Sequence, residues 1–324
     1  MSEPPVRVAM IGAGSMANRV HYPSLADEAD AEMVAICDLD VSRMSATADK
    51  FGIEKRFTDY QEMIEAVAPN AVYAIGQPEY MYSIWCWCLS HGIDLFVEKP
   101  LGLTLHQATN LKYLAESNNC VTQVDFQRRA APLLTYAQQA LAEHGPVMHA
   151  ICTFYKCQPE PMLGARDHMM DDGVHAIDTL RSVCGGSVVD IHSVTRRIGT
   201  PDVNFFAAQL VFDTGATGLL VNNWTSGRRS FNVQFHVASG SAELDLEGIG
   251  HIYTHGDTTG ITTSAQKVAD SEDLYMFAGF RAKTAEFIRS VRTREQASSN
   301  FADALETMRI ADAILHDSYE IPDC

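Results

Sequence analysis

The chain has 324 residues, 46% hydrophobic and 20% charged, which is the composition of a globular protein with enough core for two domains. Its formal net charge of −17 argues against nucleic acid or an anionic membrane surface as a partner. The sequence holds no apolar run near the roughly 18 residues that a membrane span needs and opens without a signal-peptide layout, so we expect a cytoplasmic protein.

The first elements in the chain predict a strand, a glycine turn, a helix and a second strand that ends in an acid. The apolar run 6–11 leads directly into the pattern G-x-G-x-x-A at residues 12–17, and a helical pattern continues to about residue 25. The apolar run 33–37 then ends in Asp38. In this context the glycine pattern is typical of dinucleotide binding.

Each residue of the glycine turn has a physical role in holding a dinucleotide. Gly12 permits the tight turn, and Gly14 lets the backbone approach a pyrophosphate. Ala17 is small enough for the helix to pack close to the sheet. The helix start, at Ser15 and Met16, offers backbone N–H groups and the positive end of its dipole to the phosphates. We therefore expect these five residues to bind a dinucleotide cofactor.

The acid after the second strand indicates which cofactor is preferred. Asp38 lies 21 residues beyond Ala17, where a carboxylate can accept hydrogen bonds from both ribose hydroxyls. An acid there favours NAD, because it would repel the 2′-phosphate of NADP. Arg43 leaves room for NADP, and the alternative is that Arg43 is a solvated charge on a helix.

Strands and helices then alternate up to residue 125. The predicted strands are 71–75, 95–97 and 121–124, and the predicted helices are about 42–51, 59–68, 80–91 and 104–117. This alternation predicts an α/β domain over residues 1–125, a Rossmann domain with a doubly wound parallel sheet. Right-handed crossovers place the carboxyl ends of the strands on one rim, which we expect to carry Gly12, Asp38, Gln77 and Lys99.

The predicted strand 95–97 ends abruptly in Glu98-Lys99-Pro100. Ligands of open α/β sheets bind at the carboxyl ends of the strands, which makes Lys99 a catalytic candidate. The alternative is a surface ion pair between Glu98 and Lys99 at a turn, with Pro100 starting the next loop.

The pattern changes after about residue 145. Strands are predicted at 147–155, 188–196, 205–212, 218–224, 231–238 and 242–246, and helices at about 172–183, 274–293 and 301–318. Short connections between strands predict an α+β domain over residues 126–324 with an open, mostly antiparallel sheet. It stays open whether the last helices pack back on the first domain. An open sheet has an apolar face to cover, which favours a homodimer or homotetramer formed through this sheet.

A second group of titratable residues lies at 168–178. Asp171 and His175 are four residues apart and share one face of the predicted helix. Histidine exchanges a proton near neutral pH, and a neighbouring carboxylate orients the ring and stabilises its charged form. The alternative is that Asp171 caps the helix and His175 packs between the domains. No third ligand stands at helical spacing, and the eight cysteines form no C-x-x-C pair, so we expect no metal site.

Three segments carry a resemblance to a known family. They are Gly-Ala-Gly-Ser-Met-Ala at 12–17, Glu-Lys-Pro at 98–100 and Asp-Asp-Gly-Val-His-Ala-Ile-Asp at 171–178. Over essentially its whole length the chain resembles the Gfo/Idh/MocA family of NAD(P)-dependent oxidoreductases, with weaker similarity at 126–129 and 303–305. The resemblance implies a Rossmann domain followed by an open-sheet domain, often assembled as a dimer or tetramer. It also implies hydride transfer at a hydroxyl of a sugar or cyclitol.

The resemblance also implies roles for single residues. Lys99 and His175 are expected to carry out the proton transfers with assistance from Asp171. In family members the peptide that corresponds to Lys99-Pro100 is often cis, which would aim the lysine at the substrate. We expect Gln77, Pro78 and Glu98 on the cofactor side of the site, and we expect Lys99 to contact the cofactor as well.

The chain departs from the family pattern in three places. Residues 78–82 read Pro-Glu-Tyr-Met-Tyr where Pro-Asn-x-x-His is common, and residues 164–168 read Gly-Ala-Arg-Asp-His in place of a glycine-rich run. Asp125 stands where glycine is frequent. These changes fall on the nicotinamide side and on the substrate loop, so the substrate stays open. The residues that we expect to hold a polyol or an anionic sugar are Tyr155, Lys156, Arg166, Asp167 and His168.

The resemblance leaves three functions open. The first is an NAD(P)-dependent dehydrogenase or reductase acting on a sugar, a cyclitol or a sugar derivative. The second is an NAD-dependent glycosidase or lyase that works by transient oxidation and elimination without net redox change. The third is a non-catalytic sugar-sensing protein, which the presence of both Lys99 and His175 disfavours.

Overall fold

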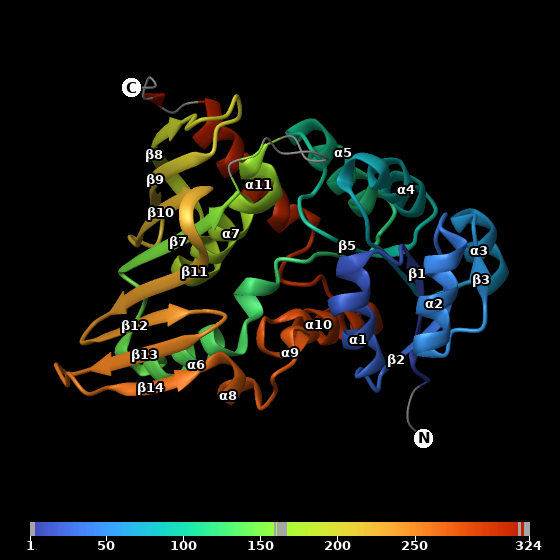
Figure 1. The fold of residues 1–324 in the computed structure, drawn as a ribbon, viewed down its shortest axis with the longest axis horizontal. Helices are drawn as coiled ribbons and strands as arrows, with labels where there is room; N and C mark the ends of the chain where they lie inside the picture. Colours follow the sequence, from blue (N-terminus) through green and yellow to red (C-terminus); the bar gives the residue numbers. More distant parts are fainter. Residues whose placement is uncertain (1–3, 159, 161–166, 317–318, 321–324) are drawn as a thin grey trace. The chain divides into compact units, whose positions relative to one another are not determined.

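The computed structural model describes residues 4–158, 160, 167–316 and 319–320 of the chain (Figure 1). The chain divides into two compact units. The first unit comprises Met1–Asp125, Leu274–Met276 and Phe280–Leu305, and the second comprises Phe126–Asp273, Phe277–Gly279 and Glu306–Cys324. The carboxyl-terminal part of the chain therefore contributes to both units.

The first unit is built on a six-stranded parallel sheet with the strand order β3-β2-β1-β4-β5-β6. The strands are β1 (Val6–Ile11), β2 (Ala31–Cys37), β3 (Arg56–Phe57), β4 (Ala71–Ala74), β5 (Asp94–Val97) and β6 (Thr122–Val124). Every neighbouring pair in this sheet runs parallel. The predicted doubly wound parallel sheet is thus confirmed, although the two-residue β3 was not predicted.

Helices connect these strands and several begin at a polar cap. They are α1 (Tyr22–Ala26), α2 (Val41–Phe51), α3 (Tyr60–Val67), α4 (Pro78–Ser90) and α5 (Leu105–Ser117). The side chains of Asp40, Asp59 and Thr104 accept hydrogen bonds from N–H groups in the first turns of α2, α3 and α5. The helix predicted after the glycine turn includes a π-helical turn, η1 (Ala17–His21), which a pattern of 3.6-residue period does not reveal.

The helix α10 (Phe280–Thr293) completes the core of the first unit. Its Phe287, Ile288 and Val291 belong to the same apolar cluster as side chains of β1 and β4. The prediction of one continuous helix over 274–293 was wrong, because α9 (Leu274–Phe277) ends before Gly279, where φ is +97°. Glycine adopts that conformation at low cost, so the chain can change direction there.

The second unit holds a nine-stranded sheet with the order β14-β13-β12-β11-β7-β10-β9-β8-β15. The strands are β7 (His149–Cys157), β8 (Val188–Arg196), β9 (Phe205–Phe212), β10 (Thr217–Asn223), β11 (Thr225–Val237), β12 (Gly240–Asp245), β13 (Ile249–Thr254), β14 (Ile261–Ser264) and β15 (Tyr319–Glu320). The β7–β10 and β8–β15 pairs run parallel, and the other pairs of the sheet run antiparallel. The mostly antiparallel sheet is confirmed, whereas β13, β14 and β15 were not predicted.

Four short helices and three longer ones accompany this sheet in the described part of the chain. They are η2 (Gln127–Ala130), α6 (Pro132–Leu141), η3 (Ala142–His144), η4 (Met169–Gly173), α7 (Val174–Cys184), α8 (Ala265–Ala269) and α11 (Phe301–His316). The helix α7 packs against β7 and β10 (Figure 1). Across the described ranges, every helix is too short or too polar to cross a membrane.

Candidate active site

The register of the parallel sheet places most of the predicted cofactor residues and Lys99 on one rim. The last residues of five strands form one registered row, Cys37, Ile11, Ala74, Val97 and Val124. The residues that directly follow this row are Asp38, Gly12, Ile75, Glu98 and Asp125. The strand order reverses between β1 and β4, and such a switch point is where open α/β sheets bind ligands.

The glycine turn has the shape that a dinucleotide requires. Gly12 has a φ of +101°, and a Cβ there would collide with the carbonyl oxygen of Ile75. A Cβ added at Gly14 would meet no atom of the described residues within 4 Å, so the turn leaves room for a pyrophosphate beside the backbone. Ser15 is exposed, whereas Ala17 is fully buried. The residues therefore fit the cofactor that the sequence predicts.

Three donors fix Asp38 at the end of β2. Its Oδ2 accepts the Ala13 N–H at 2.7 Å, and its Oδ1 accepts the Asp40 N–H at 2.8 Å and Nη2 of Arg43 at 2.7 Å. Burial alone would raise the pKa of Asp38, but these donors outweigh it and lower the pKa, so the carboxylate is ionised at neutral pH. Each carboxylate oxygen has about two lone pairs, which leaves Oδ2 able to accept a ribose hydroxyl.

Lys99 stands directly after Glu98 on the rim. The Lys99–Pro100 peptide is cis, and the Lys99 N–H donates to Oε2 of Glu98 at 3.2 Å. Lys99 is half-buried, and the side chain of Glu98 is only 12% exposed. A solvated surface pair, the alternative for these two residues, does not fit that burial. Further along the rim, Gln77 is the exposed residue before α4, and Pro78 is its buried first residue.

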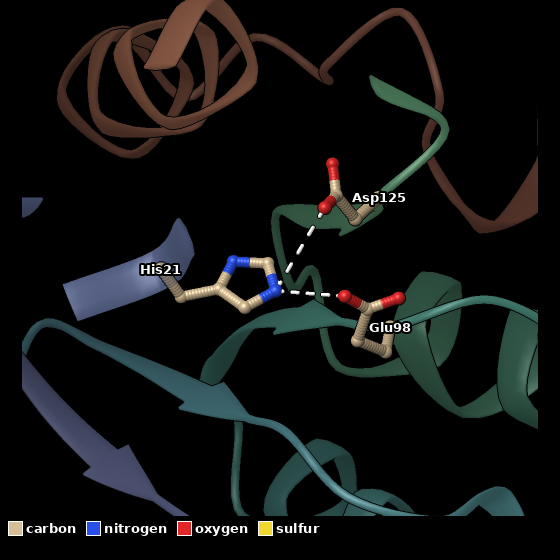
Figure 2. Close-up of side chains that lie close together, drawn as sticks. All are labelled: His21, Glu98 and Asp125. Carbon is tan, nitrogen blue, oxygen red and sulfur yellow. Dashed lines mark hydrogen bonds and ion pairs between the residues drawn. The ribbon is translucent and has the colours of Figure 1, made fainter. Parts of the chain in front are cut away.

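Glu98 also belongs to a buried cluster that the sequence did not predict (Figure 2). Its Oε1 lies 2.8 Å from Nε2 of His21, and Oδ2 of Asp125 lies 3.8 Å from the same nitrogen. His21 and Asp125 are each 1% exposed. The available signal was Asp125, an acid at the end of a buried strand. His21 gave no signal, because it lies within an apolar helical pattern.

In the second unit, Asp171 and His175 lie at the beginning of α7. Asp171 is in the π-helical turn η4, and His175 is the second residue of α7. His175 is buried and meets the ring of Phe126 edge to face, with 6.2 Å between the centroids. Asp167 makes a hydrogen bond like that of a helix cap, because its Oδ1 accepts the Met170 N–H at 2.8 Å.

Two ion pairs tie α7 and the preceding turn η4 to their surroundings. Nε of Arg129 donates to Oδ2 of Asp178 at 2.8 Å, and Nη2 of Arg129 pairs with Oδ1 of the same carboxylate. Nζ of Lys156 pairs with Asp172. The last acid of the segment 171–178 therefore anchors α7 to η2, and the ammonium of Lys156 has a carboxylate beside it.

The other predicted substrate residues have different environments. Tyr155 is half-buried in β7, and Asp167 is half-buried before η4. His168 is fully buried against Trp224, with 5.2 Å between the ring centroids, and burial lowers its pKa. Arg166 lies outside the described residues.

The sequence did not single out Asn222. This residue of β10 is fully buried, and neither its amide oxygen nor its amide nitrogen has a hydrogen-bond partner among the residues that the structure describes. A Cβ added at Gly173 would lie 3.2 Å from Nδ2 of Asn222, which places the amide beside η4. Buried amides without partners are rare, so Asn222 is a candidate for binding a polar ligand. Two asparagines at the end of an apolar strand were the available signal.

Comparison with known proteins identifies the family. Residues 6–126 match the model of an oxidoreductase family with an NAD-binding Rossmann fold, and residues 134–243 match the GFO/IDH/MocA C-terminal domain. The chain belongs to the Gfo/Idh/MocA oxidoreductase family. The resemblance found in the sequence is thus confirmed, and this family member is an NAD(P)-dependent oxidoreductase.

The individual relatives of the chain have low sequence identity to it. A D-glucoside 3-dehydrogenase of Escherichia coli (strain K12) is 34% identical over 131 residues, which cover 40% of this chain and only 37% of that protein. A myo-inositol 2-dehydrogenase of Thermotoga maritima is 24% identical over 310 residues, covering 90% of this chain and 89% of that protein. The crystal structure of a dehydrogenase from Chromobacterium violaceum has a TM-score of 0.88 at 20% identity, covering 98% of this chain and 96% of that one. At that identity the structural likeness shows the fold.

Proposed function

We propose that this family member transfers a hydride between a nicotinamide cofactor and a hydroxyl or keto carbon of a sugar, a cyclitol or a sugar derivative. The observation that carries the proposal is the single rim of the parallel sheet, on which the glycine turn, Asp38 and Lys99 follow one registered row. The names of the relatives, a D-glucoside 3-dehydrogenase and a myo-inositol 2-dehydrogenase, support this substrate class. NAD supplies the hydride acceptor when it is bound.

The proposal assigns the cofactor to residues of the first unit. The turn at Gly12 and Gly14 and the residues Ser15, Met16 and Ala17 hold the pyrophosphate, and Asp38 accepts from the ribose. Gln77, Pro78 and Glu98 line the nicotinamide side. We propose NAD as the preferred cofactor, because Asp38 is ionised and would repel a 2′-phosphate.

The proposal assigns the proton transfers to two residues. Lys99 donates a hydrogen bond to the reacting oxygen of the substrate and favours its negative charge during oxidation. His175 removes the hydroxyl proton, and Asp171 assists by favouring the charged imidazole. In the reverse direction the same groups return the proton to a ketone.

The substrate hydroxyls are assigned to polar residues of the second unit. The candidates are Tyr155, Lys156, Arg166, Asp167 and His168, and Asn222 joins them because its buried amide has no partner among the described residues. Lys156 is paired with Asp172, so a substrate beside Lys156 would also meet the negative charge of Asp172. A neutral polyol therefore suits this surface better than an anionic sugar.

A redox-neutral glycosidase or lyase is the second candidate. The observation that favours it is the E. coli relative, whose name describes oxidation of a glucoside. Oxidation of a ring hydroxyl would acidify the neighbouring C–H, so that this proton and the aglycone can be eliminated to leave an unsaturated ketone. In a glycosidase water would then add to the double bond, in a lyase the double bond would remain, and in both cases the hydride would be returned to the ketone.

One experiment tests both candidates. The purified full chain is incubated with a panel of sugars, cyclitols and glycosides in the presence of NAD or NADP, and NADH or NADPH formation and aglycone release are both followed. Reduced cofactor in proportion to product supports the dehydrogenase. Aglycone release without net reduced cofactor, together with tightly bound nucleotide, supports the redox-neutral enzyme. No turnover in either assay, with sugar binding retained, would favour a sensor.

The cellular location and the assembly stay predictions. The cytoplasm is expected from the sequence, and a homodimer or homotetramer is expected from the open sheet of the second unit. Leu219 and Ile249 are apolar side chains of this sheet that are 36% and 55% exposed in the single chain.

A further inference from the structure

In the described part of the chain, Asp125, which directly follows β6, lacks the partners that a buried acid of the same sheet, Asp94, has. Asp125 is 1% exposed, and neither of its carboxylate oxygens has a hydrogen-bond partner among the described residues. Asp94 is similarly buried, but its oxygens accept the Val121 N–H at 2.7 Å and pair with Arg294. A buried carboxylate without donors is very costly when ionised. Asp125 therefore needs a proton or a cation.

The neighbours of Asp125 could in principle hold a metal ion. One ligand atom each from His21, Glu98 and Asp125 lies within 4.8 Å of the others, and imidazole with two carboxylates is a donor set that divalent metals accept. Two features of the cluster decide between a metal and a proton.

The first feature is the distance between His21 and Glu98. Nε2 of His21 and Oε1 of Glu98 are 2.8 Å apart, which is the separation of a charge-assisted hydrogen bond (Figure 2). Such a bond has a proton on Nε2. A metal would need that nitrogen's lone pair and would replace the bond.

The second feature is the local charge. Glu98 and Asp125 bring two negative charges, and Lys99, whose charge acts on both, brings one positive charge. Lys283 of α10 also acts on Asp125 but is paired with Glu286 in the same helix. One proton on His21 balances the remaining negative charge, so the cluster reaches neutrality without a divalent ion.

We infer that His21, Glu98 and Asp125 form a buried proton-binding triad, and that Asp125 tunes the charge of Lys99 through it. The second part rests on the role proposed above for Lys99. The triad is internal to the first unit, and it joins η1 to the ends of β5 and β6. Asp125 is in this sense a positioning residue, because it acts through Glu98 and does not need to touch the substrate.

The titration of the three groups agrees with this geometry. Burial would lower the pKa of His21, but the hydrogen bond and charge of Glu98 and the charge of Asp125 raise it. Burial would raise the pKa of Glu98, but His21 and Lys99 lower it. Burial and the charge of Glu98 raise the pKa of Asp125 to about 7, although His21, Lys283 and Lys99 oppose them. The triad thus keeps one proton on His21 and binds a second at Asp125 near neutral pH.

The other side chains around the triad contribute little charge. Tyr73 of β4 and Phe96 of β5 meet the His21 ring edge to face at 6.3 Å and 5.5 Å, and Phe280 of α10 does so at 6.0 Å. Burial raises the pKa of Tyr73 far above its ordinary range, so this phenol stays neutral. The charge of the triad is therefore set by its own members, with Lys99 and Lys283 as the neighbouring cations.

Histidine NMR tests the triad without reference to activity. The full chain is labelled with ¹⁵N-histidine, the His21 signals are assigned with His21→Gln, and pH titrations are recorded for wild type and Asp125→Asn. We expect His21 to stay charged above its ordinary range and to sense a second titration near pH 7, which Asp125→Asn abolishes. The matched control is Asp190→Asn beside His192, an exposed pair at 3.0 Å, which should leave His21 unchanged.

Three results would overturn the triad. One is a His21 signal that titrates in its ordinary range, and another is a titration curve that Asp125→Asn leaves unchanged. The third is tight binding of Zn²⁺ or Mn²⁺ that removes the His21 proton, which would show a metal site. If Asp125→Asn does not fold, the wild-type titration and the infrared band of a protonated carboxyl still decide the matter.

The pH profile of turnover tests the link to Lys99. Removing the charge of Asp125 disfavours the ammonium form of Lys99, so the alkaline limb of kcat/KM should move to lower pH in Asp125→Asn. An unchanged limb would overturn the link while the NMR result stands. Near-normal turnover of Lys99→Ala would instead refute the proposed role of Lys99 and leave the triad intact.

Discussion

Nη2 of Arg43 donates a 2.7 Å hydrogen bond to Oδ1 of Asp38, the carboxylate that follows the second parallel strand. The side chain of Arg43 is 49% exposed and that of Asp38 is 7% exposed. The acid is therefore fixed by the fold, whereas the guanidinium faces solvent and has room to rearrange. The acid that we expect to favour NAD and the arginine that leaves room for NADP are therefore in direct contact.

The first prediction concerns that choice. Asp38→Asn should weaken NAD binding by about 10- to 100-fold, because hydrogen bonds to a charged group contribute about 1.5–3 kcal/mol. NADP should lose less, because the substitution removes a negative charge near its 2′-phosphate. Titration calorimetry with both cofactors measures the ratio, and Asp49→Asn, an exposed acid paired with Arg56, is the control. An unchanged ratio would remove Asp38 from the ribose site.

The second prediction concerns Lys99. Lys99→Ala should lower kcat by about 10²- to 10⁴-fold, the usual contribution of a positioned proton-transfer group. NAD affinity should change little, because the assigned pyrophosphate and ribose contacts lie elsewhere on the rim. Steady-state kinetics and cofactor binding are compared with Lys112→Ala, a lysine of α5 paired with Glu116 on the helix surface. Near-normal turnover would sink the catalytic assignment.

The third prediction concerns the glycine turn. Gly12→Ala should destabilise the protein by more than about 3 kcal/mol, because strain at positive φ adds to a collision with the Ile75 carbonyl. Gly52→Ala is a matched control at φ +69° with no described atom within 4 Å of the new Cβ, and it should cost about 1–2 kcal/mol. Urea unfolding measures both. Equal losses would show that the collision contributes nothing.

The fourth prediction separates Asp178 from Asp171 and His175, the residues of the same segment that we propose to be catalytic. Asp178→Asn should destabilise the protein by about 3–5 kcal/mol, because it leaves the charge of Arg129 poorly compensated in a nearly buried place. Glu306→Gln, which breaks an exposed pair with Arg309, should cost less than about 1 kcal/mol. Thermal unfolding tests the difference. A stable but inactive Asp178→Asn would instead indicate a direct role in turnover.

The fifth prediction is a pH dependence of stability. The pKa of Asp125 is raised to about 7 in the folded chain, against about 3.9 in an unfolded one. Between these values the folded state binds more protons than the unfolded state, so the contribution of Asp125 to stability is lost as pH rises through about 7. The unfolding free energy of wild type relative to Asp125→Asn should therefore fall between about pH 4 and pH 7 and level off above that. Urea titrations at several pH values measure it, and a constant difference would contradict the shift.

The sequence predicted the fold well where periodicity and burial agree. The strands β8 and β9 have the predicted bounds, and β9 alternates regularly between a covered and an open face. It failed at β13 and β14, which are short and begin at exposed isoleucines, so their alternation is weak. The sequence did not reveal the break between α9 and α10 at Gly279, because a single glycine is also compatible with a continuous helix.

The candidate site could be predicted where its residues form local patterns. Gly12, Asp38 and Lys99 each lie one or two residues beyond the end of a predicted strand, and the rules for parallel sheets place them on one rim. The contact between His21 and Asp125 depends on the rotation of a π-helical turn, which no local pattern specifies. Asn222 became visible only through its burial in a strand whose pairing is set by distant residues.

The position of α10 has a consequence for biosynthesis. Phe287, Ile288 and Val291 close the core around β1 and β4, yet the ribosome adds them more than 150 residues after the last strand of that sheet. Part of the apolar surface of the amino-terminal sheet therefore stays uncovered while most of the second unit is translated. The part made first is thus completed only near the end of synthesis, and a nascent chain that stops near residue 125 is one that chaperones would be expected to hold.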